Sequence, residues 1–371
     1  MVNDQDGRKV TAAAWSGGSP PPRRAATPTS AGTPRHRSPS TLTPHPTILE
    51  SPVPGPRDAA PCQPSRWPED RGGHVWPKDR EVVVDDGTRI RYAVRGPVGA
   101  PWIACVPGFL CPDTFWRDIG PDLVADHRVI MINHRGTGAS TEAGGGPRPS
   151  GADGYTIPRL AGDITAVLDA ESARDVVLLG HSMGVQVALE IWRSTPEAVS
   201  AMVLAAGAHR SPFATMYGSR AGDYVFPIAS IGIPALPRTI GNRLIRAIEL
   251  PLAQPVARWL RAIGNATPWS GMTAYRAHLS RLDHRSAIWT ARGMHDFDAT
   301  GWLADIDVPV VVMIGTMDGW CPVEVARELA ETVPASHLEV IDGGSHTLPL
   351  EAPDRVIAQL RGLTGRHAAT A

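Results

Sequence analysis

The chain has 371 residues, which is long enough for one large α/β domain with additional segments. Its 36 basic and 37 acidic residues leave a formal net charge of −1, so the overall charge gives no argument for binding nucleic acid or an anionic membrane. Four cysteines without metal-binding or disulfide spacing favour a reduced, cytoplasmic environment, and the lack of an apolar stretch of about 20 residues predicts no integral membrane segment.

Residues 1–78 differ in composition from the rest of the chain. Fourteen of the first 70 residues are proline, interleaved with serine, threonine, alanine and arginine. Such a segment buries too little apolar surface to offset the entropy lost on ordering it. We therefore predict a disordered, Pro/Arg/Ser-rich tail over residues 1–78. A transit peptide, or a start codon assigned too far upstream, would give the same composition.

Strands and helices are predicted to alternate over residues 79–210. A hairpin opens this region, with strands at 80–84 and 88–94 around the turn residues Asp85-Asp86-Gly87. After the hairpin, short apolar runs predict buried strands, and apolar residues at helical spacing predict helices. These elements are strands at 102–106, 128–132, 176–179 and 200–205, and helices at 113–125 and 157–170.

The most informative motif is Gly180-His181-Ser182-Met183-Gly184. An apolar strand precedes it and an apolar helical run, residues 185–192, follows it, so the serine lies at a sharp strand–turn–helix junction. A serine at such a turn has a strained backbone and projects its hydroxyl from the sheet edge. The positive end of the helix dipole points at the space above the hydroxyl, which would stabilise an anion there. Ser182 is therefore the predicted nucleophile.

A serine nucleophile needs a histidine base and an acid that orients the base. On a strand–turn–helix frame of this kind, the expected chain order is Ser, then Asp or Glu, then His. The strand at 308–314 leads into a loop with Asp318, and the strand at 337–341 leads into a glycine-rich loop with His346. Because parallel strands present their carboxyl ends at one sheet edge, Ser182, Asp318 and His346 are predicted to meet there.

Other acids and histidines near these loops fit the catalytic roles less well. Asp305, Asp307 and Asp342 are typical of turns and helix caps. His181 adjoins the serine, but a residue beside the nucleophile in such a turn points elsewhere. We assign His181 to packing or to the shape of the pocket.

An oxyanion hole needs two hydrogen-bond donors near the nucleophile. The backbone N–H of Met183, directly after the serine, is the first candidate. The second is the backbone N–H of Phe109, in the loop Pro107-Gly108-Phe109 that follows the strand at 102–106. Gly108 permits the backbone turn that this arrangement needs.

Residues 211–296 interrupt the alternation of strands and helices, and many of their positions are apolar or aromatic. Within this segment helices are predicted at 240–248, 253–263 and 272–282. We predict that the segment is a helical cap that lines an apolar pocket. The alternation resumes in residues 297–371, with further helices predicted at 322–333 and 350–362.

Taken in chain order, these motifs resemble those of the α/β-hydrolase fold superfamily, in its serine esterase, lipase and haloperoxidase-like branch. The resemblance covers about residues 80–362 and includes the oxyanion loop, the nucleophile elbow and the loops with Asp318 and His346. The turn Asn133-His134-Arg135-Gly136-Thr137-Gly138-Ala139-Ser140 is similar to the family's Asp-x-Arg-Gly-x-Gly-x-Ser turn. Pro107 stands where the family commonly has histidine, so the hydrogen bonds that anchor the oxyanion loop are expected to differ.

The resemblance implies an α/β fold with a mostly parallel, doubly wound sheet and an inserted helical cap. Residues 79–210 and 297–371 would form the core on either side of the cap, residues 211–296. It also implies a serine hydrolase that cleaves a small ester or related acyl compound with an apolar portion, without a metal or organic cofactor. Epoxide hydrolases and haloalkane dehalogenases of this fold use an aspartate nucleophile, so Ser182 argues against both chemistries.

Three alternatives keep the same fold. The acyl-enzyme could pass its group to an alcohol or to peroxide, as in acyltransferases and perhydrolases, or the triad could hydrolyse a carbon–carbon bond. Product analysis with competing acceptors separates these reactions. The third alternative is a ligand-binding protein with low turnover, which would bind its ligand tightly and form negligible product.

Overall fold

One sheet organises the part of the chain that the structure describes. The computed structural model describes residues 49–50, 76–140, 151–246, 252–259, 261, 263–268, 275–279 and 282–370, all within one unit, Pro46–Ala371. Over these residues nine strands pair in the order β1-β9-β8-β7-β6-β4-β5-β3-β2. Their bounds are β1 Leu49–Glu50, β2 Arg80–Val83, β3 Arg89–Arg95, β4 Trp102–Val106, β5 Arg128–Ile132, β6 Val176–His181, β7 Val199–Ala205, β8 Val310–Gly315 and β9 Ser336–Ile341.

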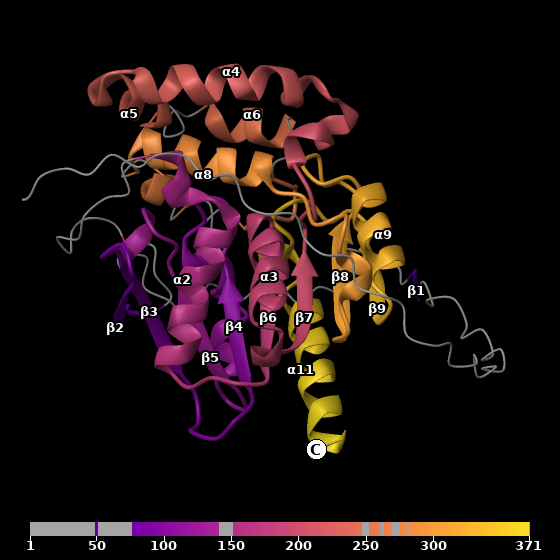
Figure 1. The fold of residues 1–371 in the computed structure, drawn as a ribbon. Helices are drawn as coiled ribbons and strands as arrows, with labels where there is room; N and C mark the ends of the chain where they lie inside the picture. The colour runs from indigo at the N-terminus through magenta and orange to yellow at the C-terminus, as the bar shows by residue number, and fades with distance from the viewer. Residues whose placement is uncertain are drawn as a thin grey trace, which may run out of the picture. The chain divides into compact units, whose positions relative to one another are not determined.

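Parallel pairing dominates the sheet (Figure 1). β4 to β9 pair in parallel with one another, with Ile103 opposite Val177 and Val311 opposite His337. β2 and β3 form an antiparallel hairpin, and β3 joins the sheet by antiparallel pairing with β5. A parallel sheet presents the carboxyl ends of its strands at one edge, where the connecting loops carry functional side chains. The predicted α/β class with a mostly parallel sheet is confirmed.

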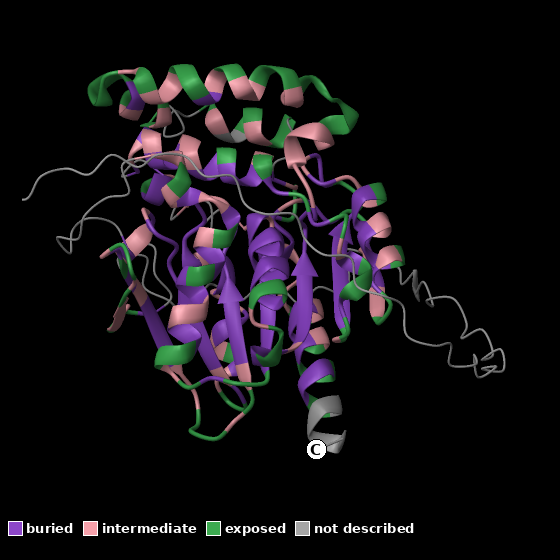
Figure 2. Cartoon of the chain, viewed as in Figure 1, coloured by how far each residue is buried: buried purple, intermediate pink, exposed green. Residues whose placement is uncertain are grey.

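Helices cover both faces of the sheet, so the inner strands β4 to β8 are almost entirely buried (Figure 2). Successive side chains of β4 point to opposite faces of the sheet. Ile103 and Cys105 belong to the buried cluster on one face, and Ala104 and Val106 belong to the buried cluster on the other. The cluster with Ala104 contains the inner sides of α2 Ile157–Ala170, α3 Met183–Ser194 and α9 Val323–Thr332, and the opposite cluster contains that of α11 Pro353–Thr370.

Two predicted helices are wrong in their extent, and proline explains both. Instead of one helix over 113–125, the structure has the short helices η1 (Asp113–Trp116) and α1 (Gly120–Leu123). Pro121 lies in the first turn of α1, where its missing N–H is tolerated, whereas a longer helix would place it in the interior. Instead of one helix over 350–362, α10 (Leu348–Glu351) and α11 are separated at Ala352, directly before a proline.

Most of the predicted tail, residues 1–78, lies outside the described residues. Within it, β1 pairs in parallel with β9, with Leu49 opposite Glu339. Trp76 is buried, and Lys78 forms a fully buried ion pair with Asp113. Trp76 and Lys78 therefore already pack on the core, slightly before the predicted core boundary at residue 79.

The predicted cap, residues 211–296, contains helices that gather at the end of the sheet toward which the arrow of β7 points (Figure 1). They are η6 Pro212–Ala214, η7 Met216–Gly218, α4 Ala221–Ala235, α5 Arg238–Arg246, α6 Ala253–Trp259 and α8 His284–Asp296. α5 and α6 correspond to the predicted helices 240–248 and 253–263, and residues 275–279 of the predicted helix 272–282 are helical. α4 and α8 are not among the predicted helices. Residues 211–296 are called the cap.

Candidate active site

Ser182 lies at the junction of β6 and α3 with φ 54° and ψ −120°, a positive-φ conformation that is strained for serine. Glycines on both sides allow the close packing that holds this turn. A Cβ at Gly180 would lie 2.6 Å from the carbonyl oxygen of Gly184, and a Cβ at Gly184 would collide with the carbonyl of Val106. The turn therefore places the Ser182 hydroxyl at the carboxyl edge of the sheet.

The structure brings Ser182, His346 and Asp318 into one hydrogen-bonded chain. His346 Nε2 lies 2.9 Å from Ser182 Oγ. His346 Nδ1 lies 3.0 Å from Oδ2 and 3.1 Å from Oδ1 of Asp318. Because Nδ1 donates its proton to a carboxylate, Nε2 accepts the hydrogen bond of the Ser182 hydroxyl. In this geometry a histidine can act as a base toward a hydroxyl.

Asp318 is held in place by its own loop. Its side chain is fully buried, and Oδ1 accepts backbone hydrogen bonds from Trp320 at 2.8 Å and Cys321 at 2.9 Å. The indole of Trp320 stacks on His346 with ring centroids 5.7 Å apart. Among the described residues, Asp318 is the one carboxylate bonded to His346, and the rival Asp342 is exposed to solvent.

His181 packs behind the serine, as its position beside the nucleophile predicts. Its ring stacks on Phe115 with centroids 5.1 Å apart, and its Nε2 donates to the backbone carbonyl of His346 at 2.8 Å. Burial, and secondarily repulsion from His346, lowers the pKa of His181 to about 3. His181 therefore stays neutral and provides a fixed hydrogen bond to the loop that carries His346. The sequence gives no sign of this bond.

The loop Pro107-Gly108-Phe109 lies against the serine. A Cβ on Gly108 would approach both His181 Nδ1 and Ser182 Cβ to 3.0 Å. The backbone N–H groups of Phe109 and Met183 pair with no acceptor in the part of the chain that the structure describes. Unpaired N–H groups on segments that flank a nucleophile are the donors that an oxyanion hole requires.

His134 anchors this loop from a neighbouring turn. Its Nε2 donates to the carbonyl of Pro107 at 2.9 Å. The adjacent Arg135 is buried and makes two hydrogen bonds of 2.6 Å to the carboxylate of Asp163, which fixes the turn. Pro107 lacks a side-chain hydrogen bond of its own, and a histidine from another segment holds its carbonyl. The motif of this turn gives no sign of the contact with Pro107 in the sequence.

Acid is expected to destabilise the fold through His134. Burial lowers its pKa to about 4, below the value of about 6.5 for an unfolded histidine. Between these values the unfolded chain binds a proton that the folded chain excludes, so the free energy of unfolding falls as the pH is lowered. From pH 7 to pH 4.5 this residue should remove about 2 to 3 kcal/mol of stability in urea titrations, and His134→Gln should abolish that part while keeping a donor for Pro107. Equal pH dependence in both proteins would contradict this assignment.

A second network joins the cap to the loop that carries His346. Glu351 Oε1 accepts hydrogen bonds from the hydroxyls of Thr267 and Ser345, each at 2.7 Å, and of Thr347 at 3.2 Å. Its Oε2 accepts the backbone N–H of Ser345 at 2.7 Å. Thr267 belongs to the cap, whereas Ser345 and Thr347 flank His346 in the sequence. The Glu351 carboxylate therefore connects the loop that carries His346 to Thr267 of the cap. Glu351 is not among the predicted site residues, because its only local signal is a carboxylate shortly after the histidine loop.

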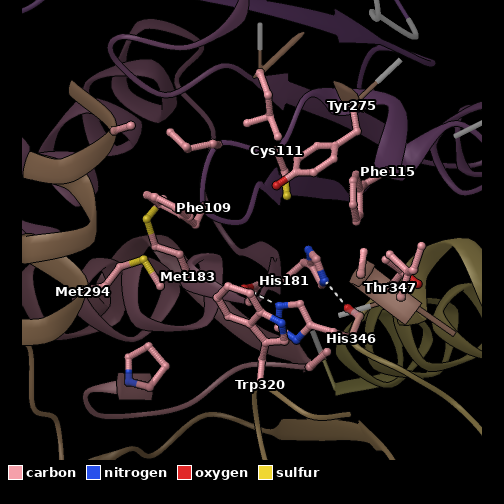
Figure 3. A pocket seen from close by; sticks show the side chains of 18 of the residues that line it. Phe109, Cys111, Phe115, His181, Met183, Tyr275, Met294, Trp320, His346 and Thr347 are labelled. Atoms are coloured by element: carbon pink, nitrogen blue, oxygen red, sulfur yellow. Dashed lines mark hydrogen bonds between the residues drawn. The ribbon is translucent and has the colours of Figure 1, made fainter. Parts of the chain in front are cut away.

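A pocket of about 750 Å³ opens at Ser182 and His346, between the core and the cap (Figure 3). Figure 3 shows Trp320 beside His346, with Tyr275, Phe115 and Cys111 on another side of the space. The other walls are largely apolar and come from both parts of the chain: Phe109, Leu110 and Met183 from the core, and Ile245, Leu279, Ile288 and Met294 from the cap.

Three polar side chains in the pocket stay protonated. Burial raises the pKa of the Tyr275 hydroxyl and of the Cys111 and Cys321 thiols well above their usual ranges. The two thiols are therefore not nucleophiles at neutral pH, because the thiolate is the reactive form. The described residues include no group of three or more His, Cys, Asp or Glu that could hold a metal ion. The Ser182 hydroxyl, which is hydrogen-bonded to His346, is the candidate nucleophile in this pocket.

Curated relatives of this chain include hydrolases that it matches over most of their length. Epoxide hydrolase A of Mycobacterium tuberculosis is 28% identical over 317 residues, covering 76% of this chain and 95% of that protein. Rhodomycin D methylesterase of Streptomyces sp. (strain C5) is 25% identical over 299 residues, covering 76% and 96%. A hydrolase from Pseudomonas aeruginosa has the same fold, with a TM-score of 0.62 and 20% identity, covering 77% of this chain and 98% of that one.

A family model described as the alpha/beta hydrolase family matches residues 103–359. The matched range begins in β4 and ends in α11, so it includes the elbow with Ser182, the loops with Asp318 and His346, and the cap between them. The chain therefore belongs to the alpha/beta hydrolase family and is an enzyme with its fold.

Proposed function

We propose that this enzyme hydrolyses a carboxylic ester, or a related acyl compound, through an acyl-enzyme on Ser182. The proposal depends above all on the hydrogen-bonded chain from Ser182 through His346 to Asp318, which opens on an apolar pocket. The similarity to a methylesterase supports the ester class. The similarity to an epoxide hydrolase does not extend to the reacting group. Epoxide hydrolases of this fold use an aspartate nucleophile, whereas residue 182 of this chain is a serine.

The geometry suggests a role for each group in the reaction. His346 Nε2 takes the Ser182 proton as Oγ attacks the acyl carbon, and Asp318 holds the other proton on Nδ1. The negative charge that develops on the former carbonyl oxygen is accepted by the backbone N–H groups of Met183 and Phe109. His346 then gives its proton to the leaving alcohol. In the second half, His346 deprotonates water, which attacks the acyl-enzyme and releases the acid.

The pocket walls indicate the kind of substrate. Apolar side chains from core and cap surround the space above Ser182, so an acyl or alcohol group that is apolar gains free energy by leaving water there. The neutral hydroxyl of Tyr275, within these walls, can give or accept one hydrogen bond without introducing charge. A small ester with one apolar part fits this arrangement better than a charged compound.

A fluorophosphonate probe tests the proposal directly, because it traps an activated serine. The folded wild-type protein should gain the mass of one probe, located on Ser182 by peptide mapping, and should cleave p-nitrophenyl esters of short and medium chain length. Ser182→Ala should lose both the label and the cleavage. The matched variant Ser200→Ala, on β7, should keep both. A folded wild-type protein that gains no label would overturn the proposal and favour a ligand-binding protein.

A further inference from the structure

Exposed apolar side chains are concentrated on the cap. Among the described residues, 13 large apolar side chains are exposed, and ten of them lie within residues 211–296. Four form one stripe on α4, since Tyr224, Val225, Ile228 and Ile231 follow helical spacing and are 72%, 65%, 75% and 71% exposed. Figure 2 shows exposed residues along the length of this helix. An apolar stripe of this kind indicates a surface that is covered in use.

The same kind of side chain also rims the pocket. Leu244 of α5, Val256 of α6 and Leu252, directly before α6, are exposed to solvent and at the same time line the pocket above Ser182. Trp259, at the end of α6, is exposed as well. An apolar compound that enters the pocket from water would cross these exposed groups. If an apolar phase covered these side chains, the compound would pass from that phase into the pocket without contact with water.

The near-zero net charge of the chain conceals a local excess of positive charge. Residues 211–270 contain six of the 36 basic residues but only two of the 37 acidic residues. All six basic residues are arginines, and Arg220, Arg238, Arg243 and Arg258 are exposed on α4, α5 and α6 or next to them. Two of these arginines have acidic neighbours, since Asp223 lies 3.8 Å from Arg220 and Asp283 lies 3.2 Å from Arg238, so Arg243 and Arg258 contribute most of the excess. The exposed part of the cap is therefore both apolar and cationic.

We propose that this exposed surface of the cap docks on the surface of an anionic phospholipid bilayer. Helices that lie in a membrane interface combine exposed apolar residues, aromatic side chains at the headgroup level and arginines that pair with anionic lipids. None of the described helices is long and apolar enough to cross a membrane. A second copy of the chain is a poorer occupant, because a symmetric contact would bring two arginine-rich faces together. Docking would hold the rim of the pocket against the lipid, where apolar esters partition.

Flotation with lipid vesicles tests the docking without any turnover, so its result does not depend on the proposed ester hydrolysis. Ser182→Ala protein should float with vesicles of phosphatidylcholine and 30% phosphatidylglycerol, and at least tenfold less with phosphatidylcholine alone. Raising the salt from 0.05 to 0.5 M should release it. Equal flotation with both lipids, or none with the anionic vesicles, would overturn the proposal.

Two pairs of variants separate the apolar part of the surface from its charge. Ile228→Asp with Ile231→Asp should reduce flotation at least tenfold, whereas Val98→Asp, at an even more exposed apolar site outside the cap, should leave it unchanged. Arg243→Gln with Arg258→Gln should reduce flotation and its salt dependence, whereas Arg174→Gln outside the cap should not.

Sedimentation velocity tests whether a second copy of the chain covers the surface instead of lipid. A dimer that Ile228→Asp dissociates, together with no vesicle binding, would assign the surface to a second copy.

Discussion

Replacing Ser182 with alanine is expected to lower the turnover number on p-nitrophenyl esters by about 10⁶. The hydroxyl that His346 Nε2 contacts at 2.9 Å would be absent, and no thiol in the pocket can replace it because burial keeps Cys111 and Cys321 protonated. A residual rate above water should remain, because the oxyanion donors and the apolar pocket do not depend on the serine side chain. Steady-state kinetics on the purified variant measure the loss.

The matched control for this prediction is Ser200→Ala, which removes a serine hydroxyl at the start of β7 that donates to the backbone of Asp175. Its turnover should stay within twofold of the wild type. Retention of more than a tenth of the wild-type rate by Ser182→Ala would show that the reaction does not pass through an acyl-enzyme on this residue.

Asp318→Asn is expected to lower turnover by about 10⁴ while leaving the fold intact. The asparagine oxygen can still accept the backbone hydrogen bonds of Trp320 and Cys321, so the loop keeps its shape. The amide nitrogen then faces His346 Nδ1, and because it is a donor it favours the tautomer with the proton on Nε2. A protonated Nε2 cannot accept the proton of Ser182, so the nucleophile loses its base.

Asp342→Asn provides the comparison, because Asp342 follows β9 in the loop of His346 and is exposed to solvent. Its turnover and its rate of labelling by fluorophosphonate should match those of the wild type, whereas Asp318→Asn should be slow in both. If the two variants unfold at temperatures within a few degrees of each other, the difference in their turnover comes from the chemistry and not from stability. Normal labelling of Asp318→Asn would mean that another group orients His346.

Several elements follow from the local sequence with little error. The strands at 102–106 and 128–132 and the helix at 157–170 have the predicted bounds, because uninterrupted apolar runs and apolar residues at helical spacing mark elements that pack on the core. The cap is less predictable. α4 is apolar on nearly all sides and contains Pro227 and Pro234, so it lacks the periodic signal of a surface helix and carries residues that argue against a helix.

The sequence by itself determined the α/β class. It also determined that Ser182, Asp318 and His346 lie at the carboxyl edge of the sheet, because each of them follows a strand in a loop with its own local signature. Only the tertiary structure decided what holds these loops in place, since the bonds join residues 165, 27 and 84 positions apart whose local sequences carry no sign of one another. These bonds are His181 to His346, His134 to Pro107, and Thr267 to Glu351. The exposed, cationic surface of the cap also belongs to the tertiary structure, because burial depends on how α4, α5 and α6 pack on the core and not on their composition.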